Sequence, residues 1–200
     1  DEFDFNCHSS LKILTSFGSH INHVASQFGL ESIQIFYPEL KAQKSRILKS
    51  VASRYNHAKL GFEYSFGLAY GERAPSVSEG YGFYLFNSFD GYDNIGNPNL
   101  KNEKAFEGSF SIGYKNDKFK TSASATYFRI YDYIIAKTDA TFVPMTIGAN
   151  GVRIYTALDY ATLFNTSISA EVYLSNSFNW FSQAIFAKGK DSQNKNLPFI

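Results

Sequence analysis

The chain has 200 residues, with 19 Lys and Arg against 18 Asp and Glu, and its net charge of +1 offers neither a basic surface for nucleic acid nor an acidic tail. Its 20 Phe, 14 Tyr, 14 Gly and 5 Pro favour strands joined by turns. No apolar stretch is long enough for a spanning helix or a signal-peptide core. The single cysteine, Cys7, excludes an internal disulfide and, without ligand spacing, a zinc site.

Large apolar and small polar residues alternate in the clearest segments, which is the period of a strand with two different faces. Seven long antiparallel strands are expected, at residues 10–21, 45–55, 59–73, 106–115, 118–135, 155–174 and 178–190. In the 59–73 segment the large residues are Leu60, Phe62, Tyr64, Phe66, Leu68 and Tyr70. In the 45–55 segment the phase that places Val51 and Tyr55 on the apolar face also places Lys49 there, and the pattern leaves that register open.

The connections between these strands alternate in length. Tight turns are expected near Asn56-His57, Asn116-Asp117 and Ser175-Asn176, and long polar segments at 22–44, 74–103 and 136–153. Three such long loops are unusual in a compact soluble domain but typical of a transmembrane barrel, where short periplasmic turns alternate with long extracellular loops.

The polar face is dominated by Gly, Ser and Ala, as expected for a watery lumen, so the large face is expected to meet lipid. Arg129, the first charge on the large face of its strand, stands ten positions beyond Phe119, which is far enough to reach the headgroup layer. The sequence therefore predicts an all-β, antiparallel, up-and-down transmembrane β-barrel, present as an incomplete segment of about seven strands with long extracellular loops. A soluble β-sandwich or lipocalin-like barrel, with the aromatic rows as its core, is the alternative.

Two motifs border the 74–103 segment. The first begins at Arg73 and contains Pro75, Ser76 and Glu79; the second contains Gly96, Asn97, Pro98, Leu100 and Glu103. Proline cannot donate to a strand ladder, so Pro75 and Pro98 mark where pairing stops. Arg73 shares the polar phase, and we expect Glu79 or Glu103 to pair with it and fix the root of the loop. Contact of Arg73 with an anionic ligand is the alternative role.

Together, in this order and spacing, the two motifs resemble the C-terminal half of the barrel of TonB-dependent outer-membrane receptors. Residues 125–134 and the closing Leu197-Pro198 also resemble family positions. Asn102 stands where the family usually has Pro, which is expected to loosen the turn. The resemblance implies a receptor of the Gram-negative outer membrane that imports a scarce ligand, such as an iron chelate, driven by the TonB complex. A passive pore or adhesin barrel is the second possibility.

The resemblance also implies partners: outer-membrane lipid, a small-molecule or metal-chelate ligand, and the TonB complex and a plug domain supplied by other parts of the protein. Residues 1–200 are expected to be a partial barrel without the plug, since a plugged transporter of about 22 strands needs a longer chain. Inward-facing charges expected to meet lumen water or the plug are Glu63, Glu107, Lys120 and Glu171.

No catalytic arrangement, phosphate loop or cofactor motif is found, so no enzymatic activity, cofactor or catalytic residue is predicted. No metal site is predicted either, because His20 and His23 would lie on opposite faces of a strand and are interpreted as solvated loop histidines. Met145 lies in a segment that faintly resembles the copper-receptor branch of the family, but a single loop Met is interpreted as an apolar anchor.

Overall fold

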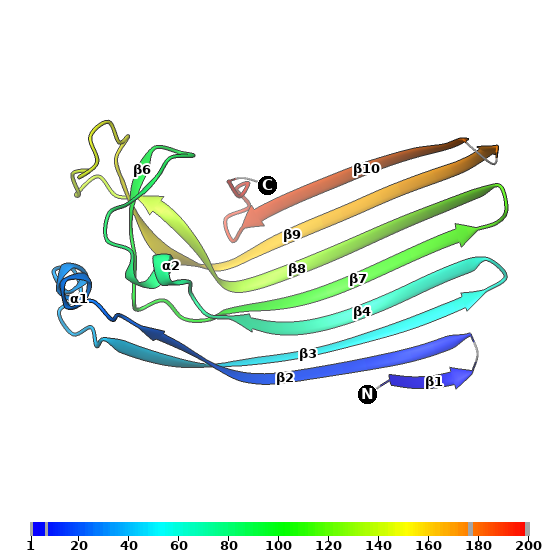
Figure 1. Cartoon of the computed structure of the whole chain (residues 1–200), viewed down its shortest axis with the longest axis horizontal. Helices are drawn as coiled ribbons and strands as arrows, with labels where there is room; N and C mark the ends of the chain where they lie inside the picture. The colour runs from blue at the N-terminus through cyan, green and yellow to red at the C-terminus, as the bar shows by residue number, and fades with distance from the viewer. Residues whose placement is uncertain (1, 7, 176–177, 199–200) are drawn as a thin grey trace.

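The computed structural model describes residues 2–6, 8–175 and 178–198, which form one large β-sheet with two short helices (Figure 1). In chain order the elements are β1 (Glu2–Asn6), β2 (Ser9–His23), α1 (Gln27–Gln34), β3 (Gln43–Lys59), β4 (Phe62–Arg73), α2 (Val77–Tyr81), β5 (Leu85–Asn87), β6 (Tyr92–Ile95), β7 (Glu103–Lys115), β8 (Phe119–Thr138), β9 (Val152–Ser175) and β10 (Phe178–Asp191). Neither helix in the described ranges is long and apolar enough to cross a membrane.

The sheet is an antiparallel meander that curves but does not close. Its strands follow the order β1-β2-β3-β4-β7-β8-β9, and β10 pairs with β9. Among the described residues no pairing joins β10 to β1, so the sheet is an incomplete barrel wall. All long connections gather at one end of the strands, called here the loop end, and the short turns gather at the other, the turn end (Figure 1).

The seven expected strands correspond to β2, β3, β4, β7, β8, β9 and β10, but one turn was predicted wrongly. The chain does not turn at Asn56-His57, because β3 continues to Lys59 and pairs with β4 up to Lys59↔Phe62. The turn is formed by Leu60 (φ 53°) and Gly61 (φ 82°), the two positive φ values that a two-residue hairpin turn requires. The alternation of apolar and polar residues continues into Leu60, so the pattern did not indicate a turn there.

The turn expected at Asn116-Asp117 is confirmed. Asn116 caps the β7–β8 turn, because its side chain accepts hydrogen bonds from the backbone N–H groups of Lys118 and Phe119, both at 2.8 Å. The turn expected at Ser175-Asn176 lies partly outside the described residues. Cys7 also lies outside them.

The two faces of the sheet follow the alternation, with large residues on what we call the apolar face and small polar ones on the polar face. The open register of β3 is settled, since Val51 pairs with Tyr70 and Tyr55 with Phe66, which places Lys49 on the apolar face too. On the polar face, hydroxyls bond across strands in the pairs Ser65–Ser111, Ser122–Ser169 and Ser124–Ser167, each at 2.8 Å. These bonds satisfy polar groups without large side chains.

Aromatic side chains of the apolar face form two belts, one near each end of the strands. At the turn end Tyr114 contacts Phe62 and Phe119, with ring centroids 4.5 and 5.5 Å apart. Near the loop end Phe106 contacts Tyr70 and Tyr131 at 4.9 and 6.1 Å, and Tyr131 contacts Tyr160 at 6.3 Å. Aromatic girdles flank the apolar band of a transmembrane barrel in this way.

The long connections are not structureless. The 22–44 segment contains α1, and the 74–103 segment contains α2, β5 and β6. The strand β6 pairs in parallel with the start of β9, through Asp93↔Val152 and Ile95↔Ile154, so the pairing is not antiparallel throughout. The parallel pair arises because the second connection folds back over the third one.

The three connections share a small hydrophobic core at the loop end. Ile33, Ile95 and Val152 are at most 1% exposed and come from the first connection, from β6 and from the start of β9. The Phe36 ring packs between aromatic rings of the other two connections, 5.8 Å from Phe83 and 5.3 Å from Phe142. Because each connection supplies a part of this core, their positions depend on one another.

Candidate functional site

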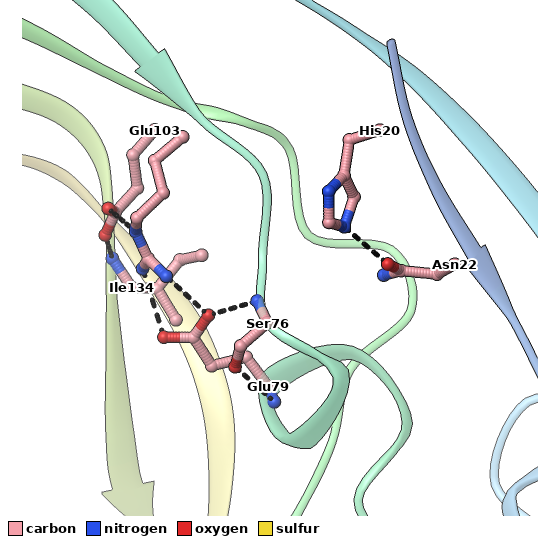
Figure 2. Close-up of polar contacts among 7 residues, drawn as sticks. His20, Asn22, Ser76, Glu79, Glu103 and Ile134 are labelled. Carbon is pink, nitrogen blue, oxygen red and sulfur yellow. Dashed lines mark hydrogen bonds and ion pairs between the residues drawn. The ribbon is translucent and has the colours of Figure 1, made fainter.

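The motif residues meet at the root of the second long connection, around Arg73 at the end of β4. The Arg73 Nε donates to Glu103 Oε2 at 2.6 Å, and its two terminal nitrogens donate to the two carboxylate oxygens of Glu79 at 2.9 and 3.0 Å. Arg73 therefore contacts both candidate glutamates, whereas the sequence interpretation expected one of them. Figure 2 shows Glu79 and Glu103 with these contacts.

Glu79 also fixes the start of α2. The Ser76 side chain accepts from the Glu79 N–H at 3.2 Å, and the Glu79 carboxylate accepts from the Ser76 N–H at 2.6 Å, which together form a capping box (Figure 2). Burial opposes ionisation of Glu79, but the hydrogen bonds from Arg73 and Ser76 outweigh it and lower the pKa of the carboxyl below its ordinary value of 4.5. The charged form of Glu79 is therefore the one that this geometry holds.

The Glu103 side chain, at the start of β7, takes the place of a backbone hydrogen-bond acceptor for β8. Its Oε1 accepts from the buried Ile134 N–H at 2.6 Å, while its other oxygen binds Arg73. The β7–β8 ladder ends at the pair Lys104↔Tyr131, so the Glu103 side chain satisfies a β8 donor that lies beyond that ladder. Glu103 thus joins β4, β7 and β8 at one carboxylate.

The second motif forms the return of the connection. Asn97 N–H donates to the Glu79 carbonyl at 2.7 Å, and the Asn97 side chain accepts from Asn99 N–H at 3.0 Å. A Cβ on Gly96 would lie 2.5 Å from Gly82 N, so this close approach of two backbone segments requires glycine. Leu100 is only 5% exposed, and Pro75 is among the fully buried side chains.

Sequence reasoning missed the residues of β3 that hold this return from the other side. Lys44 Nζ donates to the Pro98 carbonyl at 2.5 Å, and the buried Arg46 donates to the Leu100 carbonyl at 3.1 Å. Asn102, which is expected to loosen the turn, donates its side-chain amide to the Ile47 carbonyl at 2.9 Å. The only sign of these contacts in the sequence was the pair of basic residues, Lys44 and Arg46, near the start of β3. Their positions did not indicate which carbonyl groups they would bind.

The inward-facing candidates lie away from the loop root. Register places Glu107 opposite Ala69 and Phe128, and Glu63 opposite Ala58 and Gly113. Lys120 pairs with Glu171 across β8 and β9, toward the turn end. These charges share the polar face with the serine pairs but do not meet as one cluster.

His20 and His23 belong to β2, so their interpretation as loop histidines was wrong. His20 shares a hydrogen bond of 2.5 Å with the Asn22 side chain (Figure 2). Within residues 2–6, 8–175 and 178–198 no group of three or more His, Cys, Asp or Glu side chains could hold a metal ion. Met145 donates its backbone N–H to Asp93 Oδ2 at 2.8 Å, and its side chain is 64% exposed.

Comparison with known families decides the class. The family model described as "TonB dependent receptor-like, beta-barrel" matches residues 39–200. The chain belongs to the TonB-dependent receptor family. This result supports the barrel over the soluble sandwich or lipocalin. No curated protein matches the sequence.

Solved TonB-dependent receptors share the fold of the chain. The copper transporter OprC superposes with a TM-score of 0.76 at 19% identity, over 98% of this chain and 28% of that one. The siderophore receptor PirA from Pseudomonas aeruginosa gives 0.59 at 13% identity, over 92% and 40%. A mutant of the ferric enterobactin receptor PfeA from the same organism, solved with enterobactin, gives 0.57 at 12%, over 90% and 33%. The chain therefore spans less than half the length of each of these receptors.

Proposed function

We propose that the chain is a segment of an outer-membrane TonB-dependent receptor that captures a scarce ligand, an iron chelate or a metal ion, and imports it. The family match over residues 39–200 carries this proposal. The structures it resembles include a copper transporter and siderophore receptors, which makes both ligand classes candidates. In this proposal the loop end is extracellular and the turn end periplasmic.

Within the proposal, residues 1–200 form part of the barrel, and the rest of the receptor supplies the remaining wall, the plug and the segment that contacts the TonB complex. The polar face, with Glu63, Glu107, Lys120 and Glu171, then faces the lumen water or the plug. The gathering of three connections over one end supports a capture surface, because their shared core holds them together above the lumen.

The loop-root residues have a positioning role in this proposal. Arg73 donates three hydrogen bonds to Glu79 and Glu103, which supports structural pairing over contact with an anionic ligand. Gly96, Asn97, Pro98 and Leu100 complete the return of the connection, and Pro75 and Ser76 shape its entry. The long connections, in contrast, are where ligand selectivity is expected to lie.

The test is uptake by cells that express the full-length receptor as their only outer-membrane route for the probe. Ferric enterobactin labelled with radioactive iron and free cupric ion are supplied as separate probes, with and without a functional TonB complex. Uptake of either probe that needs both the receptor and TonB supports the proposal. Receptor-dependent uptake that continues without TonB indicates a passive pore, and receptor-dependent attachment without uptake of either probe indicates an adhesin; each contradicts the proposal.

A further inference from the structure

The strand β5 has an open outer edge at the loop end. It is the last strand on the path β8-β9-β6-β5, and within the described ranges no strand pairs with its outer side. An open edge presents backbone donors and acceptors to a further strand, and proteins often block such edges with charged residues. The three residues of β5, Leu85, Phe86 and Asn87, carry no charge. Another extended segment can therefore be added at this edge.

Exposed aromatic side chains lie at the same place. Phe86 is 47% exposed, and Phe89, in the turn between β5 and β6, is 80% exposed. This turn is fixed against the third connection, because the Asn150 N–H donates to the Gly91 carbonyl at 2.7 Å and the Asn150 side chain donates to the Asp90 carbonyl at 3.1 Å. Exposed apolar side chains that gather on a fixed backbone indicate an interaction surface.

The chain that leaves β10 begins a fourth connection at the loop end (Figure 1). It turns back after Asp191, and the Leu197 N–H donates to the Gly189 carbonyl at 3.0 Å. The Leu197 side chain is buried against Leu158 and Ala161 of β9. Backbone and side-chain contacts therefore fix the start of this connection.

This start brings the fourth connection to the β5–β6 hairpin. Pro198 lines a pocket of about 320 Å³, and the same pocket is lined by Asn87 at the end of β5, Asn94 of β6 and Tyr155 of β9. Pro198 is the last residue that the structure describes. The fourth connection is therefore already beside β5 at that point.

The structure contains one strand addition of this kind. The strand β6 belongs to the second connection, yet it pairs in parallel with the start of β9, through Asp93↔Val152 and Ile95↔Ile154. One connection has thus added a strand to the hairpin that carries another. A segment added to β5 would extend the same sheet by one more strand.

We propose that the fourth connection, where it continues beyond residue 200, adds a strand to the outer edge of β5 and covers Phe86 and Phe89. The inference rests on the proposed function, in which the receptor chain continues into further barrel wall. Main-chain hydrogen bonds hold the added strand, and contact with the two phenylalanines selects an apolar one. The capture surface then includes four connections rather than three.

Photo-crosslinking of the full-length receptor in outer membranes tests the proposal. The photoreactive residue p-benzoylphenylalanine replaces Phe86, and mass spectrometry identifies the linked peptide. The matched control carries the same residue at Phe110, which is 48% exposed on the apolar face of β7. We expect a link from position 86 to the part of the fourth connection beyond residue 200, and no such link from position 110.

A second pair of variants tests the edge itself and does not require a photoreactive residue in β5. With p-benzoylphenylalanine at Phe89, Phe86→Asp places a charge on the edge, and Ile35→Asp places the same charge on an exposed residue of the first connection. We expect the yield of the link to fall about tenfold in Phe86→Asp and to stay unchanged in Ile35→Asp. The heat-dependent shift in gel mobility checks the assembly of each variant.

Links only to lipid, to another protein, to the plug or to a connection that precedes residue 1 would each overturn the proposal, as would the absence of any link or equal yields in the two Asp variants. The readout is a covalent link, so it is separate from TonB-dependent uptake. A receptor that gives the expected link without uptake of either probe contradicts the proposed function alone. Uptake without the link contradicts this inference alone.

Discussion

Replacement of Glu103 by Ala is expected to release β8 locally at the loop end. Glu103 is the acceptor for the buried Ile134 N–H, and a buried donor without a partner costs about 1–3 kcal/mol. The Arg73 side chain is 48% exposed, so solvent screens its pair with Glu103 and its loss adds at most about 1 kcal/mol. The sum is about 1–4 kcal/mol in the free energy of local opening.

Hydrogen–deuterium exchange of the Ile134 amide in the full-length receptor measures this quantity. The expected loss corresponds to exchange that is roughly fivefold to nearly a thousandfold faster. Glu79→Ala is the matched control, because Glu79 shares Arg73 but does not contact Ile134. Unchanged exchange in Glu103→Ala, or equal acceleration in Glu79→Ala, would refute the assignment of the Glu103 carboxylate as the partner of this N–H.

Three further predictions concern the loop root and the turn end. Gly96→Ala is expected to destabilise the 74–103 connection by about 1–3 kcal/mol through a backbone clash, which lowers the protease resistance of this connection. Gly80→Ala is the control, because a Cβ at Gly80 has nothing within 4 Å, and it should leave the protease resistance of the connection unchanged. Leu60→Asn should stabilise the β3–β4 hairpin by up to about 1 kcal/mol in thermal unfolding, because Leu60 has positive φ and is 86% exposed; Gly61→Ala should destabilise it. Folding lowers the pKa of Glu79, so the ionised carboxylate stabilises the connection fully above about pH 4.5, and this stabilisation is lost as the pH falls below that value. Proteolysis of the connection should therefore rise on acidification, and it should rise less in Glu79→Gln.

The strands could be predicted because the alternation of large apolar and small polar residues shows which face of the sheet each residue occupies. Phe66 and Gly67 lie on the faces that the pattern assigned, and the family motifs located the loop root. The turn at Leu60 was not predictable from that period, since a large apolar residue in phase with the strand indicates more strand. Its positive φ is imposed by the pairing of Lys59 with Phe62.

The candidate site was predictable in its members but not in its contacts. Sequence spacing gives no distance, so it could not show that Arg73 reaches both glutamates or that Glu103 also serves Ile134. The shared core of the connections was hidden for another reason. Phe36 and Phe142 stand in polar segments without any period, and only the folding of one connection over another brings them together.

The shared hydrophobic core limits how the three connections can evolve independently. A substitution at Ile33 alters the support of Ile95 and Val152, which belong to different parts of the chain. If one connection is replaced by that of another receptor, the shared core loses the side chains that this connection contributed. The other two connections must then pack without them. Selectivity should transfer only when all three are grafted as a set, and natural variation in one should be matched by compensating variation in its neighbours.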